Sequence, residues 1–454
     1  MKAYKLIYIL LLCLIIGCDK IEILLPPEEE KIDKVGTGNT DARSILFLKN
    51  DTTTLYVNPD SYESYLSSEN VGDFISNEEF GKPSPADLNL YNLEDFPTLK
   101  PGLDMVLEST EGTSLQLVDY PGAFGTFVDQ AWHVNSNWWV LDPQFIDYGY
   151  DPATVVTLSG RIDTNITLTK DNKYLLSGQV FVEDGITLTI EAGTVIFGSV
   201  SVAGGAGVLI FNRGAKINAN GTPEEPIVFT TTAPVGTKNR GQWGGVVFLG
   251  KAPNNKGEDI LVEGIQGTEE GDGLYGGNDP EDSSGSFSYW RVEYAGVAIT
   301  PSNEINSLTF GSVGSKTVAH HIIIANAGDD AFQWFGGTMN ISYVATFSTL
   351  DDDMDMDSGY SGTVQFAYFI RNPFAADKGG ASSFEIGSSN ALGIQPITSA
   401  LIANVTVVGP LYQLEGLDLL ADPKYQGGVL SKEAAEALLI NSVLIGCPVG
   451  VQNP

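Results

Sequence analysis

The sequence predicts an all-β fold of stacked coils, a β-solenoid, and two observations carry this prediction. The 454 residues include 51 glycines and 22 prolines, with many Thr, Val and Ile, a balance typical of short strands joined by frequent turns. Strands expected to start near Ile322, Tyr343 and Ala367 are 21 and 24 residues apart, about one turn of a solenoid.

Echoing segments extend this pattern over the second half of the chain. Residues 174–202 alternate apolar and polar side chains over several strands, and six later segments each pair an apolar strand with a turn: FSYWRVEYAG, AHHIIIANAG, ISYVATFSTL, VQFAYFIRNP, SALIANVTVVGP and ALLINSVLIG. Such coils bury their inner faces by stacking in parallel about 4.8 Å apart. An array of immunoglobulin-like sandwiches is the rival, but it predicts turns every 8–12 residues and no echo of this length.

At the N-terminus we expect a secretion signal over residues 1–17. Two lysines precede an apolar stretch, Leu6–Ile16, that is too short to span a bilayer. The residues before Cys18 fit the bacterial lipobox, so Cys18 is the predicted lipid attachment site. An ordinary cleaved signal followed by a chance cysteine is the alternative.

Two further segments precede the predicted β-helix, which we place at residues 155–454. Residues 18–45 are charged and contain a Pro-Pro pair, as expected of a flexible tether. Residues 46–154 are less regular and are predicted to be a capping region. Its aromatic residues could stack on sugar rings, but we favour packing over an open end of the solenoid; they are Trp132, Trp138, Trp139 and Phe145.

The net charge and the cysteines exclude some partners and some kinds of stabilisation. The formal net charge of −33 would repel phosphate backbones, so nucleic acid is not expected as a partner. Solubility or cation binding explains the charge. Cys13 leaves with the signal and Cys18 takes lipid, so no intrachain disulfide is possible. Cys447 lies in an apolar run and is expected to be a buried small hydrophobe.

Several segments together carry a family resemblance: GRIDTNITLTKDNKYLLSGQVFVEDGITLTIEAGTVI, ANGTPEEPIVFTT, RGQWGGVVFLGKAP, AGDDAFQWFGG and LDDDMDMDSGYSG. Over roughly residues 118–452 the chain resembles a widespread family of Bacteroidota outer-membrane lipoproteins. The resemblance implies a right-handed parallel β-helix of the pectin-lyase-like type and an outer-membrane location. It implies no activity. Because such proteins are often found beside TonB-dependent transporters, it makes such a complex a conceivable partner.

The segment Leu350–Gly362 holds five aspartates within seven residues. In an extended strand Asp353, Asp355 and Asp357 point to one side, about 7 Å apart, where uncompensated charges would repel. Calcium suits such oxygen ligands, although the spacing is not that of an EF-hand. The predicted ligands are Asp351, Asp353, Asp355 and Asp357. The alternatives are a solvated acidic turn or salt bridges to Arg291, Arg371 and Lys378.

Acidic residues also recur at coil length. Glu304, Asp329 and Asp353 are 25 and 24 residues apart, so coils in register would place them on one face, within the range that glycoside hydrolases use. Candidate catalytic residues are Asp329, Asp330 and Asp353. Gly328-Asp329-Asp330 resembles one catalytic element of polygalacturonases, whose other three elements are missing. A pectate-lyase-like reaction would instead use bound calcium with Arg371 or Lys378 as base.

Aromatic and histidine residues complete the candidates. Trp243 and Trp334 each precede paired glycines, so they are either sugar platforms or internal ladders, and we favour the internal position for each. Glu304 and Trp334 are the candidate ligand-binding pair. Adjacent histidines point to opposite faces of any strand, so zinc is not expected; the three histidines are His133, His320 and His321. Residues 268–285 are predicted to be a surface loop, with a second calcium site as the minority view.

Taken together, these patterns predict a lipid-anchored β-helix exposed on the outer-membrane surface. We expect a non-catalytic binding or scaffold component for glycan, peptide or other nutrient ligands, stabilised by calcium. One alternative is a polysaccharide hydrolase or lyase, and the other is an accessory subunit of a TonB-dependent transporter complex.

Overall fold

The computed structural model describes residues 46–49 and 52–57 and most of residues 115–453. Within the latter range it leaves out 117, 119–121, 125–131, 134–135, 201–204, 268, 301–302, 390–392 and 415–419. Cys18, the predicted signal and the predicted tether lie outside the described residues. Strands β1 (Leu46–Lys49) and β2 (Thr52–Val57) pair antiparallel in one compact unit, and the remaining described strands belong to a second.

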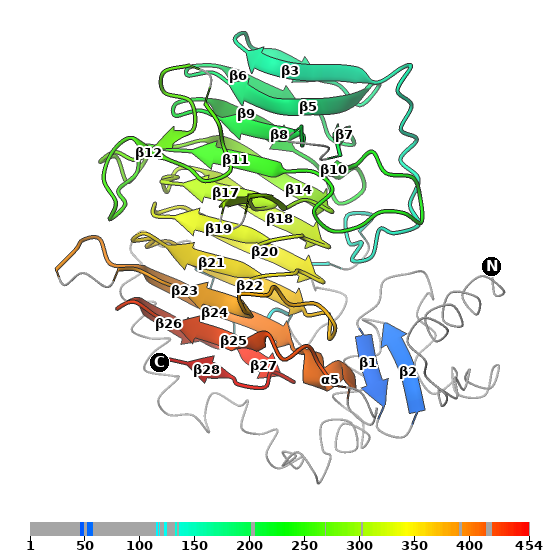
Figure 1. The fold of residues 1–454 in the computed structure, drawn as a ribbon, viewed down its shortest axis with the longest axis vertical. Helices are drawn as coiled ribbons and strands as arrows, with labels where there is room; N and C mark the ends of the chain where they lie inside the picture. Colours follow the sequence, from blue (N-terminus) through cyan, green and yellow to red (C-terminus); the bar gives the residue numbers. More distant parts are fainter. Residues whose placement is uncertain are drawn as a thin grey trace. The chain divides into compact units, whose positions relative to one another are not determined.

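The second unit is built on a single sheet of 22 strands that pair in parallel, coil upon coil, from β3 to β28 (Figure 1). Parallel pairing excludes the sandwich array and confirms the predicted stack of coils. In register, Ile322 pairs with Val344 and Val344 with Ala367, so the coil length inferred from the sequence is correct to within one residue.

The pairings form three columns, which we call faces A, B and C. Seven strands serve two faces each: β3 (Val156–Ile162), β5 (Lys173–Val182), β14 (Gly285–Glu293), β18 (Val318–Ala325), β20 (Asn340–Phe347), β22 (Thr363–Ile370) and β24 (Ser399–Val408). Face A adds β7 (Val195–Gly198), β10 (Ile227–Thr231) and β27 (Val443–Ile445). Face B adds β4 (Ile166–Leu168), β6 (Thr187–Ile190), β9 (Lys216–Asn220) and β26 (Glu436–Ile440).

Face C follows face A in each coil. It holds β8 (Val208–Phe211), β11 (Gly245–Leu249), β17 (Leu308–Gly311), β19 (Phe332–Phe335), β21 (Met354–Asp357), β23 (Ala381–Ile386), β25 (Tyr425–Ser431) and β28 (Val451–Gln452). The acidic segments of the chain lie where face A turns into face C, because Asp329 follows β18 and Asp351 follows β20.

Five strands bend at the corner between faces B and A, and each bends at a residue with a left-handed backbone. These residues have φ between 53° and 59° and occupy equivalent positions in successive coils: Tyr289, His321, Tyr343, Phe366 and Asn404. A left-handed residue is unfavourable for most side chains, so the repeated conformation marks a corner that the coil geometry requires.

The core is a continuous column of inward side chains with aromatic stacks inside it. Phe211, Phe248 and Phe287 stack at centroid distances of 4.8 and 4.9 Å, and Phe310 stacks on Trp334 at 5.4 Å. Trp243 and Trp334 are both fully buried. The internal position that we favoured for each ring is therefore confirmed. The prediction that Trp334 binds a ligand is wrong, because its ring is fully buried.

Residues 115–150, as far as they are described, form a strap along the flank of the stack. Ala123 donates a backbone hydrogen bond to Thr406 of β24 (2.9 Å), and the indole of Trp138 donates to the carbonyl of Trp290 in β14 (2.8 Å). Lys173 of β5 donates to the carbonyl of Gly149 (3.0 Å). The strap therefore runs from the late coils back to the early ones.

We had expected the aromatic residues of the strap to cover an open end of the solenoid, and they do not. Trp132 and Trp138 pack edge-on against His321 of β18, and Trp132 also contacts Tyr343 of β20. Trp138 and Trp139 are buried. These rings cover the corner between faces B and A, where outward aromatic side chains would otherwise meet water.

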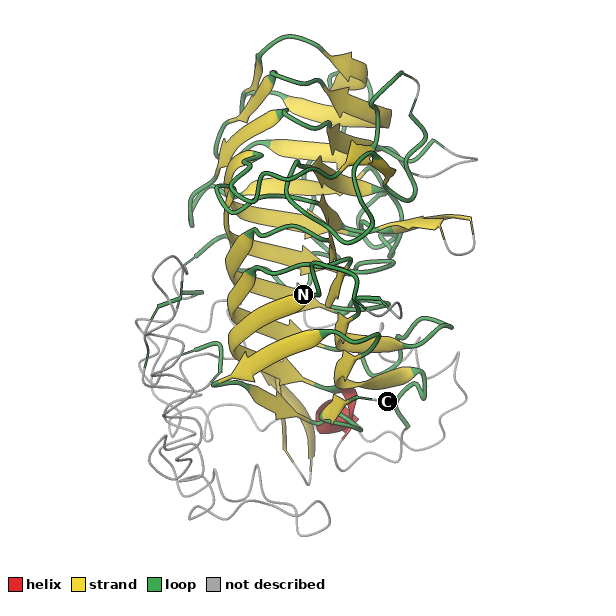
Figure 2. Cartoon of the chain, turned by 90° about the vertical axis from the view of Figure 1, so that its left-hand side faces the viewer, coloured by secondary structure: helices red, strands yellow, loops and turns green. Residues whose placement is uncertain are grey.

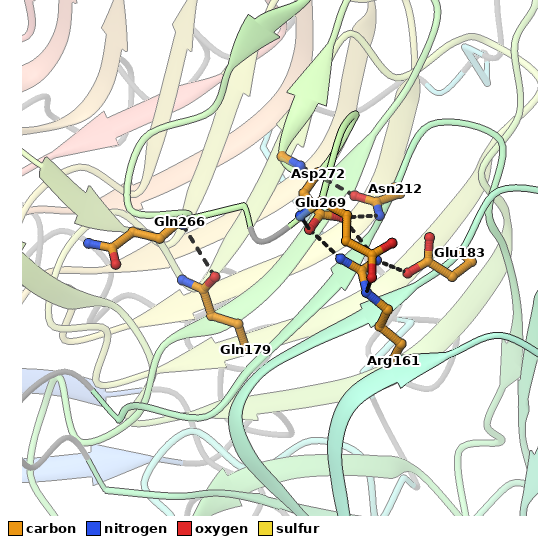
Figure 3. Close-up of polar contacts among 8 residues, drawn as sticks. Arg161, Gln179, Glu183, Asn212, Gln266, Glu269 and Asp272 are labelled. Carbon is orange, nitrogen blue, oxygen red and sulfur yellow. Dashed lines mark hydrogen bonds and ion pairs between the residues drawn. The ribbon is translucent and has the colours of Figure 1, made fainter.

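A long excursion between β11 and β14 covers the outer surface of face C. It contains the strands β12 (Ile260–Leu261) and β13 (Leu274–Tyr275) and closes a second hydrophobic cluster against β8 and β11. Figure 3 shows its anchor: Asp272 binds Arg161 of β3 (Oδ2 to Nη2, 2.6 Å) and Asn212. Since Asp272 is only 5% exposed, this segment, which was predicted to be a surface loop, is anchored to the β-helix through a buried carboxylate.

A second hairpin, β15 (Val297–Thr300) with β16 (Asn303–Ile305), projects from the side of the stack (Figure 2). It leaves the corner between faces A and C, next to the acidic segments. The one helix among the described residues is α5 (Pro410–Leu414). No helix in that part of the chain is long and apolar enough to cross a membrane.

Candidate functional site

Carboxylates gather at the corner between faces A and C and on the adjoining outer surface of face C. We call this set the acidic strip: Glu263, Glu304, Asp329, Asp330, Asp351, Asp352, Asp355, Asp357, Asp377 and Glu385. Successive coils supply Asp329, Asp351 and Glu385, so residues far apart in sequence meet here. The strip is therefore a product of the stacking.

The first group in the strip comprises Asp329, Asp330 and Asp351. One carboxylate oxygen from each lies within 4.8 Å of the others, with Asp329 and Asp351 partly exposed and Asp330 buried. The pKa of Asp329 is raised to about 8, mainly by burial and secondly by the negative charge of Asp351. Burial, followed by the charge of Asp377, raises the pKa of Asp351 to about 7. Near neutral pH the group keeps protons unless a cation replaces them.

Asp330 also has a structural task. Its backbone N–H donates to Asn306 Oδ1 (3.2 Å), and its own Oδ1 accepts from the backbone N–H of Asp352 (2.9 Å). Asp352 in turn accepts from the backbone N–H of Ser382. A ladder of side-chain oxygens thus binds the turns of four successive coils, and these bonds leave Asp330 its second oxygen.

The second group comprises Asp352, Asp355 and Glu385, again with one oxygen each within 4.8 Å. Here a cation of the chain is already present: Lys432 forms an ion pair with Glu385, and its charge also reaches Asp355 and Asp352. The two groups therefore differ in their need for an external cation, because Lys432 neutralises part of the second one.

The predicted row of three aspartates is broken at its first member. Asp355 and Asp357 are partly exposed in β21, where they alternate with the buried Met354 and Met356. Asp353 lies before the strand, where the chain still turns the corner, and it is fully buried. It accepts from Thr346 Oγ1 (2.7 Å) and pairs with Arg371 (Oδ2 to Nη1, 3.3 Å).

Asp353 therefore does not share a surface with the other predicted metal ligands, and the predicted set divides. Asp351 joins the first group and Asp355 joins the second. As a candidate catalytic residue Asp353 is wrongly placed, since it has no contact with solvent.

Arg371 is likewise internal. Its Nη1 donates to the carbonyl of Asp351 (2.7 Å), and its guanidinium lies 4.9 Å from the centre of the Tyr425 ring. Burial by itself lowers the pKa of Arg371, but the nearby acidic groups, with Asp353 first and then Tyr425 and Asp352, together outweigh it, and the pKa is raised. A fully buried guanidinium with a raised pKa does not suit the base that we considered. Arg371 holds the acidic turn from inside.

The other predicted counterions also act elsewhere or remain outside the strip. Arg291 pairs with Glu293 on its own strand (3.5 Å), and Lys378 is exposed in the turn after β22. Glu304 of β16 lies near enough to Asp329 and Glu263 to raise the pKa of both. The structure thus brings Glu304 near Asp329, with Asp351 in place of Asp353.

The histidine pair differs from the prediction. His320 and His321 are both partly exposed, and their Nδ1 atoms are 2.8 Å apart. Strict alternation would have separated them, but the left-handed backbone of His321 (φ 55°) adds an outward position at the corner. The two rings therefore share a side of the molecule.

Glu263 and Glu385 of the strip, and the Lys432 that pairs with Glu385, were not found from the sequence. Glu385 and Lys432 follow long turns that break the coil-length spacing, and Glu263 lies in the excursion that covers face C. A regular spacing was the available signal, and none of these residues obeys it. Cys447 packs partly against the core, and burial raises the pKa of its thiol to about 11.

The stack of coils joined by parallel strand pairing makes this protein a right-handed parallel β-helix. Its carboxylates gather along one corner of that β-helix. The chain belongs to the family of pectate-lyase-like β-helix domains, which matches residues 160–441. No curated protein and no solved structure matches the chain. The family confirms the predicted fold, and the lipoprotein resemblance stays a prediction.

The raised pKa values predict that the protein without divalent cations loses stability as pH rises. Asp329 and Asp351 hold protons in the folded state that they lose in the unfolded chain above about pH 4. The free energy of unfolding should therefore fall between about pH 4 and pH 8, and this fall should be smaller in Asp329→Asn. Urea unfolding in the presence of a chelator, at several pH values, measures both slopes.

The matched control is Asp171→Asn, which changes an exposed aspartate in an early turn. It should keep the wild-type slope. If Asp329→Asn also keeps that slope, the protonated group described here does not exist.

Proposed function

We propose that this protein is a non-catalytic carbohydrate-binding component of a bacterial cell surface, with calcium held by Asp329, Asp330 and Asp351. The convergence of these three carboxylates within 4.8 Å carries the proposal. Membership of a family named for pectate-lyase-like β-helices supports a carbohydrate-related role. The lipobox at Cys18 supports attachment to the outer membrane.

The donor set fits calcium better than other common ions. Calcium takes six to eight oxygen ligands in flexible geometry, whereas zinc favours nitrogen and sulfur and magnesium demands a near-ideal octahedron. The three carboxylates come from two successive turns, so they reach the ion from different directions. Bound calcium would also replace the protons that the group otherwise retains near neutral pH.

Binding is favoured over lyase chemistry because the strip lacks a suitable base among the described residues. Arg371 is buried and paired with Asp353, and Lys432 is paired with Glu385. Asp330 and Asp352 are also committed to the ladder that joins the coils. A calcium ion with open coordination positions can bind sugar hydroxyl or carboxylate oxygens without any base.

Calcium should raise the melting temperature of the chelator-treated protein. At a calcium concentration 100 times the Kd, binding to the folded state adds about 2.7 kcal/mol to its stability. Asp329→Asn and Asp351→Asn should lose most of this shift. Glu385→Gln is the matched control, because it changes a carboxylate of the second group and should keep the shift. Thermal unfolding with and without calcium measures each case.

A glycan-binding screen with and without calcium then tests the ligand. Retention of intact polysaccharide that requires calcium and Asp329 supports the proposal. Retention that requires neither calcium nor Asp329 would show that carbohydrate binding does not depend on the first group of carboxylates. If calcium leaves the melting temperature of the wild-type protein unchanged, the calcium part of the proposal is wrong.

A glycoside hydrolase is the second candidate, and the raised pKa of Asp329 favours it. A carboxyl group with a pKa of about 8 beside a partly exposed Asp351 resembles an acid paired with a base. A hydrolase would release new reducing ends during the screen. Asp329→Asn would then abolish turnover while ligand retention persists, whereas a binding protein would show no products at all.

A further inference from the structure

A second cluster of metal-ligating side chains lies away from the acidic strip, at the corner between faces B and A. His320 and His321 meet there in the middle of β18, with their Nδ1 atoms 2.8 Å apart. The third histidine of the chain, His133, is only 2% exposed. The adjacent pair is therefore the accessible imidazole site of the protein.

We propose that His320 and His321 together chelate a divalent transition-metal ion that accepts ligands at right angles, Cu²⁺ or Ni²⁺. This site is independent of the proposed calcium site, since it uses other residues on another corner of the β-helix. Its ligand class also differs, because imidazole nitrogen suits copper and nickel, whereas calcium takes oxygen.

The separation of the two nitrogens selects the geometry. Two nitrogens about 2.0 Å from one metal ion are about 2.8 Å apart when the angle between them is about 90°, and about 3.3 Å apart in a tetrahedron. The 2.8 Å between the Nδ1 atoms matches the right angle. The separation of the two nitrogens therefore suits square-planar and octahedral ions better than tetrahedral zinc.

The ring of His321 is also held in place before any metal arrives. His321 is sandwiched between Tyr289 and Tyr343, with centroid distances of 4.4 and 4.5 Å, and Trp138 of the strap packs edge-on against it at 5.4 Å. A ring fixed in this way loses little freedom on binding. Burial lowers the pKa of both His320 and His321, so both rings are neutral near pH 7.

Metal binding requires a lone pair on each Nδ1. In the metal-free pair one Nδ1 carries the proton of the N–H···N contact and the other accepts it. On binding, that proton moves through solvent to the Nε2 of its own ring, so both rings become Nε2–H tautomers. Each Nδ1 then donates its electron pair to the ion, and no net proton release accompanies binding to the two neutral rings.

Titration of the full chain with Cu²⁺, supplied as its glycine complex to suppress weak binding, tests the site. We expect one equivalent to bind with nitrogen ligation in the electron paramagnetic resonance spectrum. The ion should quench tryptophan emission, because Trp138 lies beside His321. His320→Gln should weaken binding by at least about tenfold, and Ni²⁺ should bind at least as tightly as Zn²⁺.

Ser342→Ala is the matched control, since Ser342 pairs with His320 in the next coil and offers no imidazole. It should bind Cu²⁺ as the wild type does. His320 lies outside the Tyr289–His321–Tyr343 stack, so His320→Gln is expected to keep its circular dichroism spectrum and melting temperature. Wild-type affinity in this variant, or a spectrum with oxygen ligands alone, would overturn the proposal.

Discussion

Replacing Arg371 with methionine is expected to lower the free energy of unfolding by about 3–5 kcal/mol, the usual cost of removing one partner of a buried ion pair. Arg371 and Asp353 are both fully buried, 3.3 Å apart. Without the guanidinium, Asp353 would remain as an uncompensated charge inside the β-helix, and the carbonyl of Asp351 would lose its donor. Denaturant unfolding followed by circular dichroism measures the loss.

Two variants make this prediction specific. Lys378→Met removes a positive charge from the exposed turn after β22 and should change stability by less than about 0.5 kcal/mol. The double variant Arg371→Met with Asp353→Asn removes both charges and should recover part of the loss. If Arg371→Met proves as stable as Lys378→Met, the buried pair does not hold the acidic turn.

Trp334→Ala is expected to cost about 3–5 kcal/mol, the range for removing a large aromatic side chain from a packed core. Trp334 is fully buried in face C, where its ring stacks on Phe310 of the preceding coil at 5.4 Å and on Phe332 of its own strand at 5.8 Å. The same variant distinguishes the two positions that the sequence allowed for this ring. A sugar platform would cost ligand affinity with little stability, whereas a core ring costs stability.

Phe335→Ala is the matched control, because it changes the next residue of the same strand. Phe335 faces outward against Tyr275, with a centroid distance of 6.1 Å, and its exposure is intermediate. Its loss should be clearly smaller than that of Trp334→Ala. A reversed order of the two losses, measured by thermal and denaturant unfolding, would contradict the inward position of Trp334.

The fold could be predicted because stacking leaves a repeat in the sequence. Each coil must bury the same inward positions, so apolar strands recur near Ile322, Val344 and Ala367 at similar spacing. The strap left no such signal. Its tryptophans show only that they must be covered, and the surface that covers them is assembled from several coils.

The candidate site could be predicted in part, for the same reason. Glu304, Asp329 and the aspartates after β20 recur at coil length, and the structure brings Glu304, Asp329 and Asp351 together. The choice of Asp353 failed because strand alternation does not extend through a corner. The separation of His320 from His321 failed for a related reason, since one left-handed residue cancels the alternation.

The strap has a consequence for the order in which the molecule can be completed. Its hydrogen bonds from Gln116 to Gln365 and from Ala123 to Thr406 span 249 and 283 residues. A polypeptide that emerges from the ribosome or a translocon N-terminus first exposes Trp138 and Trp139 long before their partners exist. Trp138 stays exposed until the coils that contain Trp290 and His321 have formed. The hydrogen bond of Ala123 cannot form before Thr406 has been synthesised, so docking of the strap is expected to be a late step in maturation.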